Sequence, residues 1–348
     1  MRLSKVVRSV SLMACAMLAV APAVVAYGAT GPYSVLNKWV IGGQGGWDYL
    51  AADPSAHLLY LTHGPRVEVV DTTTGKAVGA ITDLKGTHGV ALDPNGKYGY
   101  ISDGQANAVV VFDRKTFAKV NSIPVGTNPD GILYEPATKT VWAFNGKSSD
   151  ATVIDTATMK VVSTIKVSGR PEFPVADGKG TVFVNIENKN SIVKLDAKAL
   201  KQTAEWTLKG CESPSGLAMD TQHGRLFSVC DGKVMAVTDS TSGKVLKLVP
   251  IGEGPDAVAY DAKNQLAFSS NGQDGTLTIV NTKNDSLDVV QTLETQKSGR
   301  TLAFDSATGR VYVVVVEMGA KPAPTAENPK PRATIVPGSF SVLVVGKK

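Results

Sequence analysis

Short apolar segments that end in an acid recur along most of the chain. HGVALD (88–93) and DGILYE (130–135) are two examples, and turns rich in Gly, Pro or Asn follow such segments. Successive closing acids are 40, 42, 42, 43, 41 and 44 residues apart, which predicts an internal repeat. The seven closing acids are Asp53, Asp93, Glu135, Asp177, Asp220, Asp261 and Asp305.

A second marker repeats with the same period. It is the acid or amide that closes an alternating run such as NAVVVFD (107–113). Each unit therefore predicts four short strands: the apolar segment, an aromatic-led strand such as YGYIS (98–102), the alternating run, and a final strand such as KVVSTI (160–165). Four strands in about 42 residues form one blade of a β-propeller. The second marker falls at Asp71, Asp113, Asp155, Asp196, Asp239 and Asn281.

The seventh unit contains only three of the four expected strands. Its segments are RTLAFD (300–305), RVYVVVVE (310–317) and SFSVLVVG (339–346). SVLNKWVI (34–41) precedes the first unit and matches the final strand of the others. We expect this segment to complete the seventh blade and leave no open edge at the join. The predicted fold is all-β, a seven-bladed β-propeller of four-stranded blades that forms a single domain over residues 27–348.

The first 26 residues have the pattern of a secretory signal peptide. Arg2, Lys5 and Arg8 precede an apolar run, and the small residues before and at Ala26 suit cleavage there, which predicts a periplasmic or secreted protein. This segment holds three of the 36 basic residues, so 33 remain against 31 acids. Basic and acidic residues are therefore nearly equal in number, without the basic surplus that is typical of nucleic-acid binding. No later apolar run reaches the roughly 20 residues of a membrane-spanning helix, so no membrane span is expected. We also expect the protein to be a monomer.

One unit also carries a family resemblance. NPDGILYEPATKTVWAFNGKSSDATVIDTATMKVVSTIKV (128–167) resembles the forty-residue YVTN-type repeat of YncE-like exported propellers. The likeness extends over essentially all of residues 27–348 and implies the same fold. Propellers of this superfamily resemble lactonases, the heavy subunits of amine dehydrogenases and haem d1-binding domains. The resemblance is therefore compatible with several functions, among them docking on a redox enzyme, and it does not favour one of them.

The repeat register places one residue of each unit at the mouth of the central channel. That residue lies five positions before the closing acid, where the first strand begins, on what we call the top face. Its identity varies while its polarity is kept, which favours a ligand site there. We call these seven residues the channel ring: Asp48, His88, Asp130, Glu172, Ser215, Asp256 and Arg300. Trp47 and Phe173 adjoin the ring, and we expect them to add apolar contacts to a ligand.

A second station precedes the loop after the second strand, on the same face. It holds His63, Asp103, Asn145, Cys230, Asn271 and Val315, with an uncertain register in the fourth blade. Histidines and carboxylates are ligands for zinc and other divalent metals, and crowded carboxylates also suit acid/base catalysis. The alternative is a hydrated channel lined by polar side chains. The candidate metal ligands are His63, His88, Asp48, Asp103 and Asp130.

Two further features belong to the top face. Cys211 precedes Ser215, and Cys230 ends the adjacent strand, so a disulfide is expected in an exported protein, with a reactive thiol as the alternative. EMGAKPAPTAENPKPRATIVPG (317–338) is a Pro-rich loop in the seventh blade. We call this loop the arm, and interpret it either as a solvated excursion or as a flap or docking element over the channel mouth.

The sequence favours a non-enzymatic binding or scaffold module that holds a small molecule or a protein at the top face. The alternative is a metal-assisted or acid/base enzyme, lactonase-like or lyase-like, that uses the histidines and carboxylates of the channel ring. A divalent metal is the only cofactor the residues suggest. His57 and His223 fall in turns on the opposite face and are expected at the surface.

Overall fold

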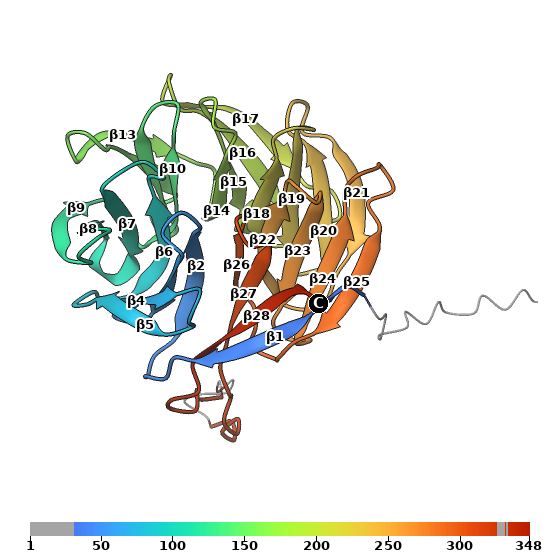
Figure 1. The fold of residues 1–348 in the computed structure, drawn as a ribbon. Coiled ribbons are helices and arrows are strands. Elements are labelled where there is room, and N and C mark those ends of the chain that lie inside the picture. The colour runs from blue at the N-terminus through green and yellow to red at the C-terminus, as the bar shows by residue number, and fades with distance from the viewer. Residues whose placement is uncertain (1–30, 326–330, 332) are drawn as a thin grey trace, which may run out of the picture.

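The structure is a computed structural model that describes residues 31–325, 331 and 333–348. The predicted signal peptide, residues 1–26, lies outside the described residues. Seven antiparallel four-stranded sheets surround a central axis, and the chain passes through them in order (Figure 1). The predicted seven-bladed β-propeller is confirmed. Within the described part of the chain, no helix is long and apolar enough to cross a membrane.

The first three blades each use four consecutive strands, and the first strand of each blade contacts the first strands of its neighbours. Blade one consists of β2 (Trp47–Asp53), β3 (Leu58–His63), β4 (Arg66–Asp71) and β5 (Ala77–Ile81). Blade two consists of β6 (Thr87–Leu92), β7 (Tyr98–Asp103), β8 (Ala108–Asp113) and β9 (Lys119–Pro124), with the 3-10 turn η1 (Gly104–Ala106). Blade three consists of β10 (Pro129–Glu135), β11 (Thr140–Asn145), β12 (Asp150–Asp155) and β13 (Lys160–Lys166).

The next three blades repeat this order. Blade four consists of β14 (Pro171–Ala176), β15 (Thr181–Ile186), β16 (Ser191–Asp196) and β17 (Lys201–Thr207), with the 3-10 turn η2 (Glu187–Lys189). Blade five consists of β18 (Pro214–Asp220), β19 (Arg225–Cys230), β20 (Val234–Asp239) and β21 (Val245–Pro250). Blade six consists of β22 (Pro255–Asp261), β23 (Leu266–Asn271), β24 (Thr276–Asn281) and β25 (Val289–Glu294).

The seventh blade combines both ends of the described chain. β26 (Leu302–Asp305), β27 (Arg310–Val315) and β28 (Ser341–Lys347) are completed by β1 (Tyr33–Val40), which pairs antiparallel with β28. Gln291 of blade six also holds β1 in place: Tyr33 N donates to Gln291 Oε1 at 3.1 Å, and Gln291 Nε2 donates to Tyr33 O at 2.9 Å. The predicted closure by an N-terminal strand is confirmed, and it leaves β28 no unpaired edge.

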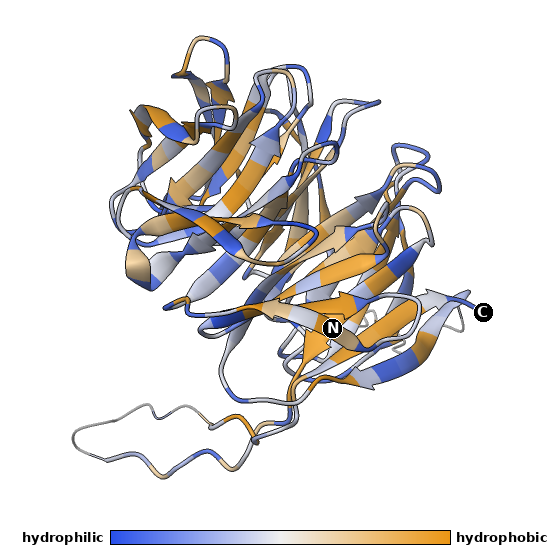
Figure 2. Ribbon diagram, turned by 60° about the vertical axis from the view of Figure 1, so that its left-hand side comes forward, coloured by the Kyte–Doolittle hydropathy of each residue, from blue (hydrophilic) through white to orange (hydrophobic). Residues whose placement is uncertain are grey.

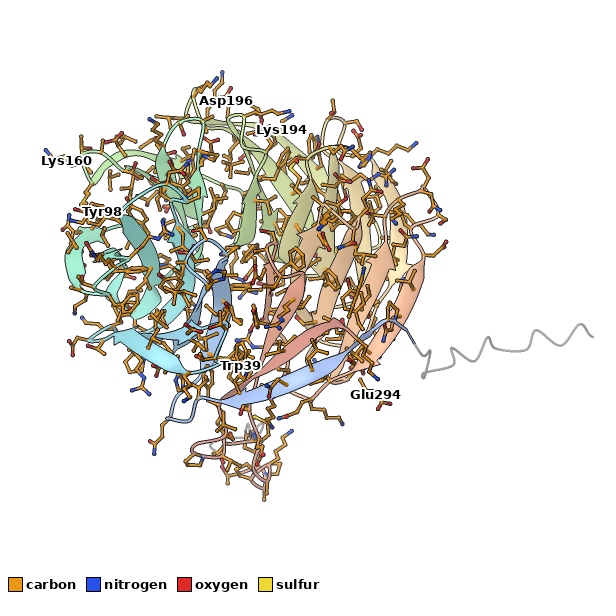
Figure 3. The ribbon with its side chains drawn as sticks, viewed as in Figure 1. Trp39, Tyr98, Lys160, Lys194, Asp196 and Glu294 are labelled. Atoms are coloured by element: carbon orange, nitrogen blue, oxygen red, sulfur yellow. A yellow bond between two sulfur atoms is a disulfide. The ribbon has the colours of Figure 1, made fainter. Side chains whose placement is uncertain are left out.

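Apolar side chains fill the spaces between neighbouring blades. At the closure, Phe268 of blade six lies between Tyr33 and Phe304 of blade seven, with ring centroids 5.5 and 5.8 Å away. Figure 2 shows the apolar residues concentrated along the strands and hydrophilic residues in many of the loops. The exposed Lys160 and Glu294 lie at the outer rim of the ring (Figure 3). Polar side chains that are only partly buried lie instead near the starts of the first strands, beside the channel.

The closing acids of the repeat are turn residues. Asp261 Oδ1 accepts hydrogen bonds from the backbone N–H groups of Lys263 and Asn264, each at 3.0 Å. Asp53 accepts one from Ser55 Oγ at 2.7 Å and also contacts the guanidinium of Arg114 in blade two. A carboxylate that bonds backbone groups two and three residues ahead fixes a tight turn. The repeated acid is thus separated from the channel ring by the length of the first strand.

Candidate functional site

In blades one to six, the first strand presents its ring residue at an irregularity of the β-ladder. The pairing of β2 shifts register between Trp47 and Leu50, and that of β10 between Pro129 and Ile132. A β-bulge of this kind bends a strand and re-aims a side chain. Similar register shifts surround the ring positions His88, Glu172, Ser215 and Asp256.

Glycine follows the ring residue in three blades because the next blade approaches closely there. A Cβ added to Gly131 would lie 2.3 Å from the carbonyl oxygen of Glu172. A Cβ added to Gly216 would lie 2.7 Å from the carbonyl oxygen of Asp256. No side chain fits at such distances, so the absence of a Cβ lets neighbouring ring residues come into contact.

Six of the seven ring residues form one continuous line of polar contacts. His88 Nδ1 lies 2.6 Å from Asp48 Oδ2 and 3.7 Å from Asp130 Oδ1. On the other side of Asp48, Arg300 Nη2 lies 3.4 Å from Asp48 Oδ1. The line continues from Arg300 to Asp256, whose Oδ1 accepts a hydrogen bond from Ser215 Oγ at 2.5 Å. These six residues are therefore in contact with one another, and ligand binding by them stays a prediction.

Glu172, the seventh ring residue, stands outside this line. Its carboxylate lies 3.5 Å from Arg170 Nε, and the same guanidinium also contacts Glu187. Burial and the nearby charge of Asp130 raise the pKa of Glu172 to about 8, against the opposing effect of Arg170. Glu172 is therefore largely protonated at neutral pH and can donate a hydrogen bond.

The two neighbours of Asp48 in the line have shifted pKa values as well. Burial and the charge of Asp48 raise the pKa of Asp130 to about 6, although His88 acts in the opposite direction. Burial disfavours the charged form of His88, but the hydrogen bond to Asp48 and the charge of Asp130 raise its pKa to about 9 overall. At neutral pH the imidazolium of His88 therefore lies between two carboxylates.

Two aromatic side chains close the channel beneath the seven residues of the channel ring. Tyr49 is buried, and its ring centroid lies 4.6 Å from that of Phe173 on the opposite side of the channel. The phenol of Tyr49 is within hydrogen-bonding reach of Ser215, while burial raises its pKa well above the usual range. Phe173 thus packs in the channel and does not line the cavity above it. Tyr49 was not identified as a site residue from the sequence. Its position directly after a ring residue, where three other blades have glycine, could have indicated it.

A cavity of about 1100 Å³ opens above this closed channel. Four ring residues line it, namely Glu172, Ser215, Asp256 and Arg300. Trp47, expected beside the ring, also lines the cavity, and the Arg300 guanidinium lies 5.5 Å from its ring centroid. The remaining wall comes from top-face loops and from the arm, through Met318, Lys321 and Ala333.

The five residues expected as metal ligands divide into two groups. Asp48, His88 and Asp130 each offer one donor atom, and these atoms lie within 4.8 Å of one another. His63 and Asp103 are not part of this cluster, which corrects the expected five-residue set. The physical reason for His63 is that it pairs with Trp47 and stacks on Phe340 of blade seven, so its imidazole is packed away from His88.

The two excluded residues have other surroundings. His63 is buried and stacks on Phe340 with ring centroids 3.9 Å apart, and its Nδ1 lies 3.7 Å from Glu68 Oε1. Asp103 accepts hydrogen bonds from the backbone N–H groups of Lys85 and Gly86, at 3.0 and 2.8 Å. The uncertain station in the fourth blade is Ile186, which pairs with Pro171.

The expected disulfide joins Cys211 to Cys230, with 5.4 Å between their Cα atoms. It ties the loop that enters blade five to β19 of the same blade. Ser213, two residues after Cys211, lines the cavity, so the cross-link fixes part of its wall. A free reactive thiol at either position is excluded by this bond.

Comparisons with known proteins bear on the fold. The chain is similar to a chain of hydrazine synthase from Kuenenia stuttgartiensis, with 16% identity, a TM-score of 0.67, and coverage of 84% of this chain and 95% of that one. It is also similar to U3-55K, with 11% identity, a TM-score of 0.73, and coverage of 87% of this chain and 97% of that one. The WD40 repeats of RRP9 match with 11% identity, a TM-score of 0.74, and coverage of 88% of this chain and 96% of that one. No family model matches the chain. No curated protein matches it either. The similar structures support the seven-bladed propeller and, at these identities, the fold alone.

Proposed function

We propose that this protein is an exported YVTN-type propeller that binds a small molecule or a partner protein at the top of its channel without transforming it. The β-propeller fold commonly serves as a binding or scaffold module. The observation that carries the proposal is the cavity of about 1100 Å³ over a closed channel. Ligand sites are concave, of roughly 300–1,000 Å³, and combine apolar walls with a few convergent polar groups.

The chemistry of the cavity favours a polar ligand without a large net charge. Its basic residues are Arg170, Lys297, Arg300 and Lys321, and its acidic ones are Glu172, Glu187, Asp231 and Asp256. Arg170 and Arg300 are already engaged by carboxylates of the same wall. Trp47 supplies an aromatic surface beside these paired charges. A ligand with several hydrogen-bonding groups and an apolar face fits this lining.

The test compares the compounds retained by wild type with those retained by a variant whose cavity is partly filled by a larger side chain. Gln273 is exposed and lines the cavity, so Gln273→Trp reduces its volume without removing a buried contact. The protein is dialysed against a small-molecule extract of the exported fraction, and retained compounds are identified by mass spectrometry. We expect compounds that wild type retains and Gln273→Trp releases.

A matched control places the same bulk elsewhere. Gln222 is exposed in the turn at the opposite end of β18, so Gln222→Trp should retain what wild type retains. Chemical cross-linking in the same fraction covers a protein partner, with Lys321 at the cavity as the attachment point. Identical retention and identical cross-links in both variants would show that the cavity is not the binding site.

Export belongs to this proposal and has its own test. Its support is the pattern of residues 1–26, with three basic residues before an apolar run. A disulfide between Cys211 and Cys230 agrees with an oxidising compartment. N-terminal sequencing of the protein from fractionated cells should begin at Tyr27. An intact N-terminus in the cytoplasmic fraction would contradict export.

Glu172 favours a second candidate function, acid/base catalysis in the same cavity. It lines the cavity and, with a pKa of about 8, keeps a proton at neutral pH that a general acid can donate. Lactone hydrolysis is the reaction to test, using a panel of aliphatic and aromatic lactones followed by acid release. Turnover that is lost in Glu172→Gln would support an enzyme, and its absence across the panel would leave the binding module.

A further inference from the structure

We propose that Asp48, His88 and Asp130 bind one divalent first-row transition metal or zinc ion at the mouth of the channel. The three residues are the second residues of the innermost strands of blades one, two and three, namely β2, β6 and β10. The site adjoins the cavity but does not depend on its ligand, because none of the three residues lines that cavity.

The distances suit an ion after a small adjustment. The three donor atoms lie within 4.8 Å of one another, with His88 Nδ1 2.6 Å from Asp48 Oδ2 and 3.7 Å from Asp130 Oδ1. Tetrahedral bonds of about 2.0–2.2 Å place neighbouring donor atoms about 3.4 Å apart. The Asp130 contact is already near that separation. The Asp48 contact must lengthen by under about 1 Å, which a rotation of the carboxylate provides.

Gly104 holds the imidazole in the required orientation. A Cβ added to Gly104 would lie 2.6 Å from His88 Nε2, so the ring rests directly on this residue. The other nitrogen, Nδ1, is thereby directed at Asp48 and Asp130. In metal sites a hydrogen bond from the second ring nitrogen usually fixes the imidazole, and here packing against Gly104 restrains it. The position of His88 is therefore built by the backbone of blade two and not only by its attraction to the carboxylates.

The charges around the cluster leave room for a cation. Asp130 has one ion-pair partner among the described residues, His88 at 3.7 Å. Asp48 shares Arg300 with Asp256. An ion of charge +2 that replaces the His88 proton would neutralise both carboxylates of the cluster. The exposed fractions of the His88, Asp48 and Asp130 side chains are 26%, 15% and 18%, so solvent can reach the site and complete the coordination.

The ligand types identify the class of metal. One imidazole nitrogen with two carboxylate oxygens suits zinc, cobalt or manganese. Calcium and magnesium prefer sites built from oxygen ligands alone. The proposal therefore requires selectivity for zinc or cobalt over calcium.

The experiment is calorimetric titration of the full chain, freed of metal with a chelator, using Zn²⁺ alone, with Co²⁺ absorption as a second readout. Wild type should bind one ion, and Co²⁺ should show the visible bands of a site with nitrogen and oxygen ligands. His88→Gln and Asp130→Asn should each weaken binding by more than the roughly 10–100-fold lost with an outer-shell partner. Gly104→Ala, which displaces His88 without removing a ligand, should weaken it within that range.

His223→Gln is the matched control. His223 Nδ1 lies 2.6 Å from Asp220 Oδ2, a comparable part-buried histidine–carboxylate pair in the turn after β18. This variant should bind Zn²⁺ as wild type does. Circular dichroism establishes that each variant is folded. The proposal is overturned if wild type binds no Zn²⁺, if Ca²⁺ displaces it at equal concentration, or if folded His88→Gln and Asp130→Asn bind it unchanged.

Discussion

Arg300 of blade seven lies 3.4 Å from Asp48 of blade one, across the junction where the ring of blades closes. The same guanidinium contacts Asp256 of blade six and lies over the ring of Trp47. One side chain therefore links three consecutive blades at the channel mouth. β1 completes the same seventh blade at its outer edge, where it pairs with β28.

Replacement of Arg300 should loosen this junction. Arg300→Met leaves Asp48 and Asp256 without their shared cation, and we expect the free energy of unfolding to fall by about 1–2 kcal/mol, since the pair is partly screened by solvent. Urea denaturation measures the change. Lys247→Met, which removes an exposed pair with Asp288 at 3.9 Å and a contact with the carbonyl oxygen of Ser286, should cost less than about 1 kcal/mol. Equal losses in both variants would contradict a special role for Arg300.

Removal of β1 should open the seventh blade. A chain without residues 1–42 leaves the edge of β28 unpaired, and we expect lower thermal stability and self-association through that edge. Size-exclusion chromatography and thermal unfolding measure both effects. A synthetic peptide of residues 31–42 should restore a monomer by pairing with β28. A truncated chain as stable and monodisperse as wild type would show that closure does not stabilise the propeller.

The disulfide should contribute measurably to stability. Cys211 and Cys230 are separated by 19 residues, and the chain-entropy estimate for closing a loop of this size is about 3 kcal/mol. The double variant Cys211→Ala, Cys230→Ala should lose about that amount in urea denaturation. Reduction of wild type should reproduce the loss, and reduction of the variant should have no effect. A variant that is still sensitive to reductant would point to another bond.

Tyr49 and Phe173 should act as a packed plug rather than as ligand contacts. Tyr49→Ala removes a buried aromatic side chain and should lower the free energy of unfolding by about 3–5 kcal/mol. Tyr49→Phe keeps the packing and loses only the contact with Ser215, at a cost of about 1 kcal/mol. Denaturation of the two variants separates packing from hydrogen bonding. Similar losses in both would indicate that the hydroxyl, and not the ring, holds the channel closed.

Asp53 should make the propeller sensitive to acid. Burial opposes its ionisation, but the contacts with Arg114 and Ser55 lower its pKa overall. A carboxyl with a lowered pKa in the folded state stabilises the fold above its unfolded pKa of about 3.9. That contribution is lost as the pH falls through the lower folded value.

Asp53→Asn tests this dependence. It leaves Arg114 without its buried partner and should cost about 3 kcal/mol at pH 7. Because Asn does not titrate, the stability of the variant should fall less steeply than that of wild type as the pH drops below about 4, the unfolded pKa of Asp. Thermal unfolding at a series of pH values measures both slopes. Parallel curves would assign the acid sensitivity to other turn acids, such as Asp113 or Asp155, whose pKa values are also lowered.

The sequence by itself determined the number of blades, the strand order and the closure by β1, and it favoured the pairing of Cys211 with Cys230 over free thiols. These follow from the chain because a period of about 42 residues places equivalent positions at equivalent places in every blade. For the same reason the repeat register placed all seven ring residues at the channel mouth. It also separated the turn acid Asp261 from the ring residue Asp256.

Only the tertiary structure decided which of these residues meet. Asp48 pairs with His88 and Arg300, while Glu172 is left out of the line and faces the cavity. His63 shares a face with Trp47 and stacks on Phe340 instead of joining His88. Contacts across the channel depend on bulges, on glycines that let strands approach, and on side chains from blades far apart in sequence. A repeat gives each residue its station, but the distance between two stations is set by the packing of the whole ring.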